Sequence, residues 1–250
     1  MTLNKKILSI VLTLILVLSN ALFSNQTLAL AQKDNIKLKV FEHFPKNEAG
    51  TKGKVISWCT KTTNDQVADY ILFGDHMPLA GITYRINYST KPKSLSQTQI
   101  DQAVKSATNT WTVADPNEKF NYDGSTTAVA SKYDGINTIS WSRLNSQAIA
   151  ITYSWYNAST KELTEVDTVY NTKYQWSYTT YTGSNDCSGV AGTYDLQDLA
   201  THEFGHWVGL DDLYNQADKD LTMYGYADTQ ELKKGSLGNG DIMGVRAVLP

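Results

Sequence analysis

Residues that can bind a metal ion, and one that can act as a base, lie close together near the C-terminal end of the sequence. His202, Glu203 and His206 stand in the order His-Glu-x-x-His, and Gly209 and Asp212 follow at intervals of three residues. Imidazole and carboxylate groups are common zinc ligands. A carboxylate beside such an ion can take a proton from a metal-bound water. These residue types therefore indicate a zinc site suited to hydrolysis.

A helix is expected to carry the two histidines. Asp195 can cap its first turn, because a short carboxylate accepts hydrogen bonds from the free N–H groups there. Histidines four residues apart lie about 6 Å apart along a helix axis, so both rings can reach one ion. Gly209 can adopt the positive φ that ends a helix and turns the chain back. Apolar residues at intervals of three and four give the helix one buried stripe: Leu196, Leu199, Ala200, Phe204, Trp207 and Val208.

This run resembles the extended zinc motif of the metzincin metalloproteases, His-Glu-x-x-His-x-x-Gly-x-x-His. Asp212 stands where that motif has its third histidine, whereas neighbouring Asp211, the alternative ligand, falls one residue short. The segment from Leu221 to Gly225 resembles the metzincin Met-turn, with Met223 as its methionine. The sequence that follows is similar to the end of the matrixins, the matrix metalloproteinase family.

The resemblance implies an α+β fold: a metzincin-like catalytic domain with a twisted, mostly parallel β-sheet, an active-site helix, a Met-turn and a C-terminal helix. It implies one catalytic zinc ion held by His202, His206 and Asp212, with Glu203 as general base and Met223 supporting the site without binding metal. It also allows for bound calcium. The expected function is a secreted zinc-dependent endopeptidase that cleaves the peptide bonds of proteins with a zinc-activated water.

A secreted, non-catalytic binding protein on the same scaffold is the alternative function. The 15 Tyr and 6 Trp residues could contact wall polymers or host proteins, although packing within the sheet is the favoured interpretation. His202, Glu203 and His206 are all intact, and a decayed site would be expected to lose its base first. The sequence therefore favours catalysis.

Composition limits the partners. With 250 residues, 41% of them hydrophobic, the chain can form one sizeable core. A formal net charge of −3 leaves no basic footprint for nucleic acid. We expect a monomer whose partner is a protein or peptide substrate.

The first 31 residues are typical of a secretory signal peptide. Lys5 and Lys6 precede an apolar run over residues 7–18, and Ala29 and Ala31 provide small residues for cleavage. The alternative is a retained membrane anchor, but the run is short beside the roughly 20 residues of a membrane span. We therefore expect an extracellular protein without a membrane partner once the signal is removed.

Residues 32–78 are expected to form an N-terminal extension or a pro-segment removed on activation. Residues 36–41 alternate as a strand, and His43 and His76 are expected to be surface or loop residues. Cys59 and Cys187 are an even pair in an exported chain, which favours a disulfide. The resemblance offers an alternative, since latent matrixins block their zinc with a cysteine before the catalytic domain, but the sequence around Cys59 lacks the Pro-Arg-Cys-Gly signature of that switch.

Residues 79–250 are expected to form the metalloprotease domain. Ser96 and Gln99 make a capping box at the start of an amphipathic helix. Alternating or β-branched residues predict strands at 81–88, 136–141, 148–156 and 163–170. Residues 165–171 resemble the matrixin strand beside the active-site cleft, which would offer its edge to a peptide.

Overall fold

A computed structural model describes residues 35–46, 67–180 and 189–248. The predicted signal peptide, Cys59 and Cys187 lie outside the described residues. Among the described residues, no helix combines the length and the apolar character needed to cross a membrane.

A seven-stranded sheet forms the centre of the fold, in the order β3-β2-β4-β6-β5-β1-β9. Strands β2, β3, β4 and β6 pair in parallel, β5 runs antiparallel to both β6 and β1, and β9 is parallel to β1. The predicted strand at residues 36–41 is confirmed and extends to Pro45. The strands are β1 (Ile36–Pro45), β2 (Ile82–Ile86), β3 (Phe120–Ser125), β4 (Asn137–Ser142), β5 (Ala150–Asn157), β6 (Leu163–Asn171) and β9 (Tyr226–Ala227), with a separate short pair β7 (Trp176–Ser177) and β8 (Tyr194–Asp195).

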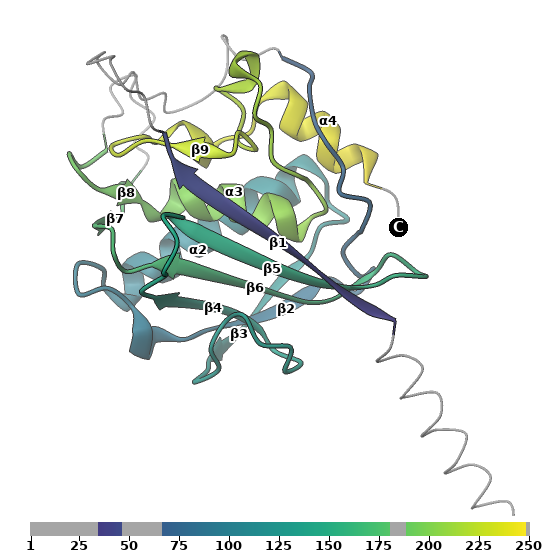
Figure 1. Cartoon of the computed structure of the whole chain (residues 1–250), viewed down its shortest axis with the longest axis horizontal. Helices are drawn as coiled ribbons and strands as arrows, with labels where there is room; N and C mark the ends of the chain where they lie inside the picture. Colours follow the sequence, from purple (N-terminus) through teal and green to yellow (C-terminus); the bar gives the residue numbers. More distant parts are fainter. Residues whose placement is uncertain (1–34, 47–66, 181–188, 249–250) are drawn as a thin grey trace, which may run out of the picture.

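Two long helices lie together against one face of this sheet, as Figure 1 shows. Helix α2 (Gln97–Ala114) begins with the predicted capping box, in which Ser96 and Gln99 bond each other's main chain. Helix α3 (Leu196–Trp207) carries the histidine pair, and α4 (Asn239–Ala247) lies near the C-terminus. The described residues also include the 3-10 turns η1 (Tyr88–Thr90), η2 (Gln216–Asp218) and η3 (Lys233–Gly235). The predicted α+β fold is confirmed.

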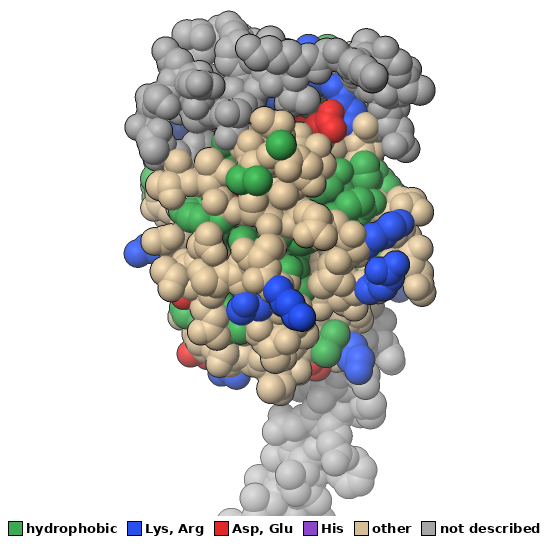
Figure 2. Space-filling model, turned by 90° about the vertical axis from the view of Figure 1, so that its left-hand side faces the viewer, with side chains coloured by type: hydrophobic (Ala, Val, Ile, Leu, Met, Phe, Trp, Pro, Cys, Tyr) green, Lys and Arg blue, Asp and Glu red, His purple; other side chains and the backbone are tan. Residues whose placement is uncertain are grey.

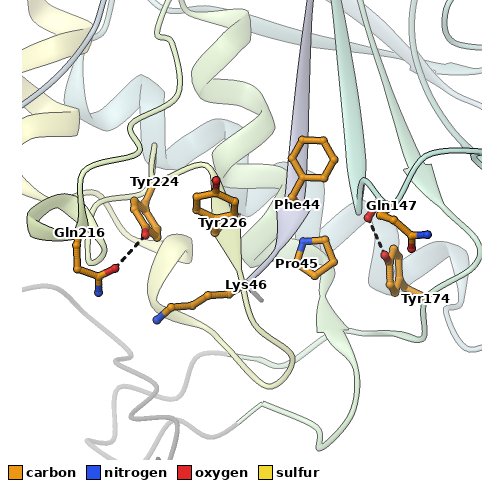
Figure 3. A pocket seen from close by; sticks show the side chains of 8 residues that line it. All are labelled: Phe44, Pro45, Lys46, Gln147, Tyr174, Gln216, Tyr224 and Tyr226. Carbon is orange, nitrogen blue, oxygen red and sulfur yellow. Dashed lines mark hydrogen bonds between the residues drawn. The ribbon is translucent and has the colours of Figure 1, made fainter. Parts of the chain in front are cut away.

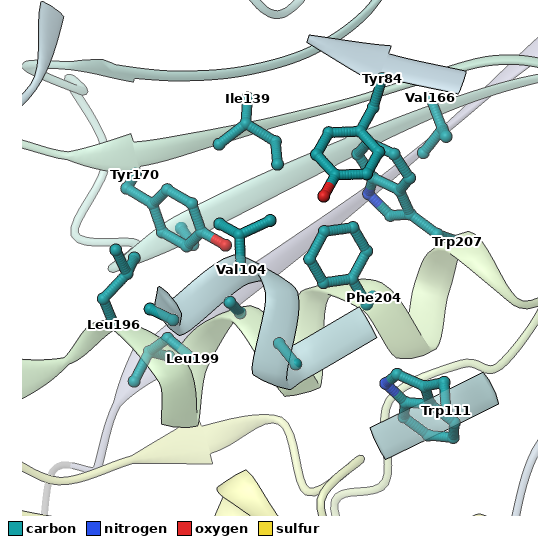
Figure 4. Close-up of a cluster of buried hydrophobic side chains, with 14 of the residues drawn as sticks. Tyr84, Val104, Trp111, Ile139, Val166, Tyr170, Leu196, Leu199, Phe204 and Trp207 are labelled. Atoms are coloured by element: carbon teal, nitrogen blue, oxygen red, sulfur yellow. The ribbon is translucent and has the colours of Figure 1, made fainter. Parts of the chain in front are cut away.

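The core lies between the sheet and these helices. Figure 4 shows aromatic and aliphatic side chains from β2, β4, β6, α2 and α3 packed together. Trp111 of α2 is fully buried, and its indole N–H donates to the carbonyl of Thr201 at 2.8 Å, which ties the two helices together. The aromatic residues in this core therefore have a packing role, which is the interpretation that the sequence favoured.

One prediction about the sheet is wrong. Residues 165–171 lie in β6, which is covered on both edges by β4 and β5. The strand whose edge passes the zinc helix is β5, and β1 pairs with that edge. Strand β5 precedes β6 in the chain and pairs with it antiparallel, so it covers the edge of β6 that the prediction left open to a peptide.

Charged, polar and hydrophobic side chains are interspersed on the face of the molecule drawn in Figure 2. Figure 2, which faces the left-hand side of Figure 1, shows Lys and Arg side chains scattered between hydrophobic and polar ones. On the face shown, they do not join into one continuous stripe of the kind that follows a nucleic-acid backbone.

Candidate metal centre

Helix α3 begins and ends as its sequence predicts. The Asp195 carboxylate accepts hydrogen bonds from the main-chain N–H groups of Gln197 and Asp198, at 2.9 and 3.1 Å. The chain leaves the helix through Gly209, whose φ of +100° favours glycine. A Cβ atom at Gly209 would also lie only 2.5 Å from the carbonyl oxygen of Asp75. This turn brings Asp212 back towards the helix.

His202, His206 and Asp212 converge in the buried interior. One ligand atom from each of the three lies within 4.8 Å of the other two. Oδ1 of Asp212 is 3.2 Å from Nε2 of His202 and 3.8 Å from Nε2 of His206. Ligands about 2.0–2.1 Å from a tetrahedral zinc ion lie roughly 3.3 Å apart. The three side chains are therefore positioned to bind a metal ion.

Main-chain carbonyls hold both imidazole rings. Nδ1 of His202 lies 2.7 Å from the carbonyl of Thr222, and Nδ1 of His206 lies 2.8 Å from that of Leu210. A carbonyl can only accept, so each Nδ1 carries the proton and each Nε2 presents a lone pair. Burial lowers the pKa of His206 to about 4, which keeps its ring neutral.

The donor set fits a cation. Oδ1 of Asp212 is buried and has no hydrogen-bond donor among the described residues. Burial raises the pKa of Asp212 above its ordinary value. Two imidazole lone pairs and a carboxylate oxygen directed at one point are stable together when a cation lies between them.

The neighbouring carboxylate is directed elsewhere. Oδ2 of Asp211 forms an ion pair with Nζ of Lys39 at 2.6 Å. Among the described residues, the groups able to hold a metal include Asp212 and do not include Asp211. The structure thus brings Asp212 to the two histidines and leaves Asp211 with Lys39.

Glu203 lies beside this group at the end of a chain of hydrogen bonds. The Thr152 hydroxyl donates to Oε2 of Glu203 at 2.6 Å. Thr152 is also 2.7 Å from the Thr168 hydroxyl, which accepts from the indole N–H of Trp207 at 3.0 Å. Since each hydroxyl has one proton, the donors run in one direction, from Trp207 through both threonines to Glu203.

This arrangement leaves the second oxygen of Glu203 available. Oε1 is buried and has no hydrogen-bond partner among the described residues. Burial raises the pKa of Glu203 to about 8, against the opposing effect of the Thr152 hydroxyl. A carboxylate in such a place can take up a proton, as a general base must. Sequence reasoning missed Thr152 and Thr168, which face each other across β5 and β6.

The predicted Met-turn lies directly beneath α3. A Cβ atom added at Gly205 would collide with Sδ of Met223, so the absence of a side chain at Gly205 lets the turn approach the helix. Asp241 in the first turn of α4 holds the turn, since its carboxylate accepts from the N–H groups of Thr222 and Met223 at 2.8 and 3.0 Å. Sequence reasoning missed Asp241, whose only local signal is its place three residues after Gly238.

The prediction that His43 is a surface or loop residue is wrong. His43 lies on β1 and is 1% exposed. Its Nδ1 is 2.8 Å from Nε2 of His202, and His43, His202 and Glu203 form a second group able to hold a metal. Residues 32–78 were expected to form an N-terminal extension or a pro-segment, and pairing of β1 with β5 brings His43 to the metal site. His76, by contrast, is a partly exposed loop residue as expected.

Comparison with known protein families agrees with this geometry. The family model for matrixins matches residues 77–249. The chain belongs to the matrixin family. No curated protein gives a significant match. Matrixins are zinc-dependent, so the family supports a metalloprotease type of function and protein or peptide substrates. The matched range of this matrixin begins after β1, so His43 lies outside it.

A cavity of about 720 Å³ lies beside the end of β1 in this matrixin. Figure 3 shows aromatic rings around it, with the Tyr224 hydroxyl 3.3 Å from Oε1 of Gln216 and the Tyr174 hydroxyl donating to the carbonyl of Gln147 at 2.7 Å. Its walls come from β1, β9 and the loops beside them: Phe44, Pro45, Lys46, Gln147, Tyr174, Gln216, Tyr224 and Tyr226.

Proposed function

We propose that this matrixin is a secreted zinc-dependent endopeptidase. His202, His206 and Asp212 hold one zinc ion, and Glu203 is the general base. The observation that carries the proposal is the convergence of three buried ligand atoms, with both Nδ1 atoms bonded to carbonyls, beside a carboxylate with one unpaired oxygen.

Zinc, when bound, lowers the pKa of a water to about 7 and polarises the scissile carbonyl. Glu203 would take up the proton of the attacking water at Oε1 and pass it to the leaving amine. Thr152 holds Oε2, so the carboxylate keeps one orientation during both transfers. Met223 supports α3 from below through its contact at Gly205.

The strand beside the metal site suggests an extended peptide as substrate. Strand β5 passes the metal site, because Thr152 within it bonds Glu203. Its outer edge pairs with an antiparallel strand, β1, and an extended substrate would use the same main-chain groups. Peptide bonds of proteins are therefore the proposed substrate.

The proposal includes processing of the chain. Residues 1–31 direct export and are removed, residues 32–78 precede the catalytic domain, and Cys59 pairs with Cys187. Calcium remains an expectation from the family. Mass spectrometry of the secreted protein, with and without reductant, tests both the cleavage after residue 31 and the disulfide.

Glu203→Gln tests the mechanism, because glutamine keeps the size of the side chain and cannot act as a base. We expect zinc content to stay at about one per chain. Hydrolysis of casein or gelatin should fall by about 10²–10⁴-fold. Glu162→Gln, the same change at an exposed position, is the matched control. Equal hydrolysis by the Glu203→Gln protein and the control would refute the mechanism, whereas binding to wall material with no chelator-sensitive hydrolysis would favour the binding-protein alternative.

A further inference from the structure

A fully buried lysine lies beside the Met-turn. Lys234 belongs to η3, on the loop between β9 and α4, and its side chain is 0% exposed. Burial of an ammonium group is unfavourable unless hydrogen bonds and negative charges compensate for the lost water. The contacts of this side chain therefore indicate what the buried charge does.

The ammonium group bonds two carbonyls of the Met-turn, one on each side of Met223. Nζ of Lys234 donates to the carbonyl of Thr222 at 3.0 Å and also to the carbonyl of Tyr224. One cation thus fixes the orientation of two peptide groups. Lys234 holds the turn through its carbonyls, whereas Asp241 holds it through its N–H groups.

The carbonyl of Thr222 is shared with a candidate metal ligand. It accepts from Nδ1 of His202 at 2.7 Å, the bond that leaves Nε2 of this ring with a lone pair for the metal. A carbonyl oxygen has two lone pairs, so it can accept from the ring and from the ammonium group together. The orientation of His202 therefore depends on an oxygen that Lys234 holds. The ring of His206 is held instead by the carbonyl of Leu210.

The main chain at Lys234 is fastened to the zinc helix. The N–H groups of Lys234 and Gly235 donate to Oδ1 of Asp198, at 2.5 and 3.1 Å. Asp198 lies on α3, one turn before His202. Residue 234 is thus anchored to the helix that carries the ligand, while its Nζ reaches the carbonyl that orients the ligand.

The neighbouring lysine has different partners. Lys233 is also buried, but its Nζ forms ion pairs with Glu231 at 2.9 Å and with Asp220 at 3.6 Å, and it donates to the carbonyl of Lys219. None of these partners belongs to residues 221–225 of the Met-turn. Two adjacent buried lysines therefore allow an ammonium group to be removed with or without loss of the bond to Thr222.

We propose that Lys234 is a positioning residue of the metal site, because its ammonium group holds the Thr222 carbonyl to which the ring N–H of His202 donates. This inference rests on the part of the proposed function that makes His202 a zinc ligand, and it adds a residue that does not touch the metal. Groups that hydrogen-bond a metal-bound histidine fix its tautomer and ring orientation, and their loss lowers metal affinity or activity by about 10–100-fold. Lys234 acts one hydrogen bond further from the ion, through the carbonyl.

The first test follows the two histidine rings with Co(II) in place of zinc. The unpaired electrons of Co(II) strongly shift the ring N–H signals of bound histidines, so His202 and His206 can be measured separately. Lys234→Met removes the ammonium group and keeps a long, unbranched side chain. We expect the ring N–H of His202 to exchange with water about tenfold faster in this variant, while that of His206 keeps its rate. Lys233→Met is the matched control and should leave both rates unchanged.

Activity gives a second measurement, made at a zinc concentration that saturates the site. A misoriented ligand impairs the chemical step, so kcat for casein hydrolysis by Lys234→Met should fall by about tenfold, with KM little changed. Lys233→Met should keep the kcat of the wild-type chain. Equal losses of kcat in the two variants, or equal exchange rates for His202 in all three proteins, would overturn the proposal.

A measurement on the wild-type chain decides the matter even if Lys234→Met fails to fold. The ring N–H of His202 and Nζ of Lys234 bond the same oxygen, so NMR of the zinc-loaded chain should show a nuclear Overhauser effect between the two side chains. Absence of this effect would overturn the proposal.

The outcomes separate this inference from the proposed function. Failure of the wild-type chain to bind either Co(II) or zinc would refute the metal site, and both proposals with it. Metal binding with the expected exchange rates, but no casein hydrolysis by any of the three proteins, would support the role of Lys234 and refute the endopeptidase.

Discussion

Replacing Thr152 by valine should weaken Glu203 as a base and leave the metal in place. The Thr152 hydroxyl donates to Glu203 at 2.6 Å, and valine has a similar branched shape without the hydroxyl. A hydrogen bond to a charged group contributes about 1.5–3 kcal/mol. This bond stabilises the charged carboxylate, so its loss should raise the pKa of Glu203 by about 1–2 units, at about 1.4 kcal/mol per unit.

A base must be deprotonated to act, so the acid limb of the profile of kcat/KM against pH should move up by the same amount. At pH values below that limb, kcat/KM of Thr152→Val should be roughly 10–100-fold lower than that of the wild type, since each pKa unit corresponds to a tenfold change in the fraction of charged Glu203. Casein hydrolysis is measured from about pH 6 to about pH 11 together with zinc content. Thr83→Val, the same change at an exposed position of β2, is the control. An acid limb at the wild-type position, with zinc fully bound, would refute the role of Thr152.

Further predictions address the ligands, a buried carboxyl group and the Met-turn. Asp212→Ala should weaken zinc binding by more than the 10–100-fold typical of residues outside the ligand set. Asp211→Ala should not, because Asp211 pairs with Lys39; equal losses would contradict the assignment. Burial, aided by the charge of Asp115, raises the pKa of Glu118 from 4.5 to about 7. The folded state therefore binds this proton more tightly than the unfolded state does. The free energy of unfolding falls as pH rises between those two values. Urea unfolding of Glu118→Gln should show a gain of up to about 3 kcal/mol near pH 8 and none near pH 4, and an equal gain at both would be inconsistent with titration. Gly205→Ala should lower stability by about 1–3 kcal/mol through collision with Met223, and an unchanged Tm would argue against that packing.

The part of the site that sequence could predict is local. The spacing of His202 and His206, the cap at Asp195 and the turn at Gly209 all follow from helix geometry within one segment. The structure agrees with the cap and the turn, and it brings Asp212 to the two histidines. Each of these features depends on residues no more than ten positions from the helix.

The part that sequence could not predict depends on contacts between distant segments. Thr152 reaches Glu203 across 51 positions, and His43 reaches His202 across 159. Nothing in the periodicity of β5 shows that Thr152 faces a carboxylate. The same limit explains the wrong edge strand, because a strand's neighbours depend on the register of the whole sheet.

The hydrogen bonds that orient the metal site come from a different part of the chain than the strand that lies over it. The carbonyls of Thr222 and Leu210 hold the histidine rings from α3 and the Met-turn, and Asp241 holds that turn. None of these hydrogen bonds involves β1, which contacts the site through Phe41 and His43 and pairs Lys39 with Asp211 beside it. His202 and His206 would therefore keep the hydrogen bonds that orient their rings whether or not β1 is paired with β5.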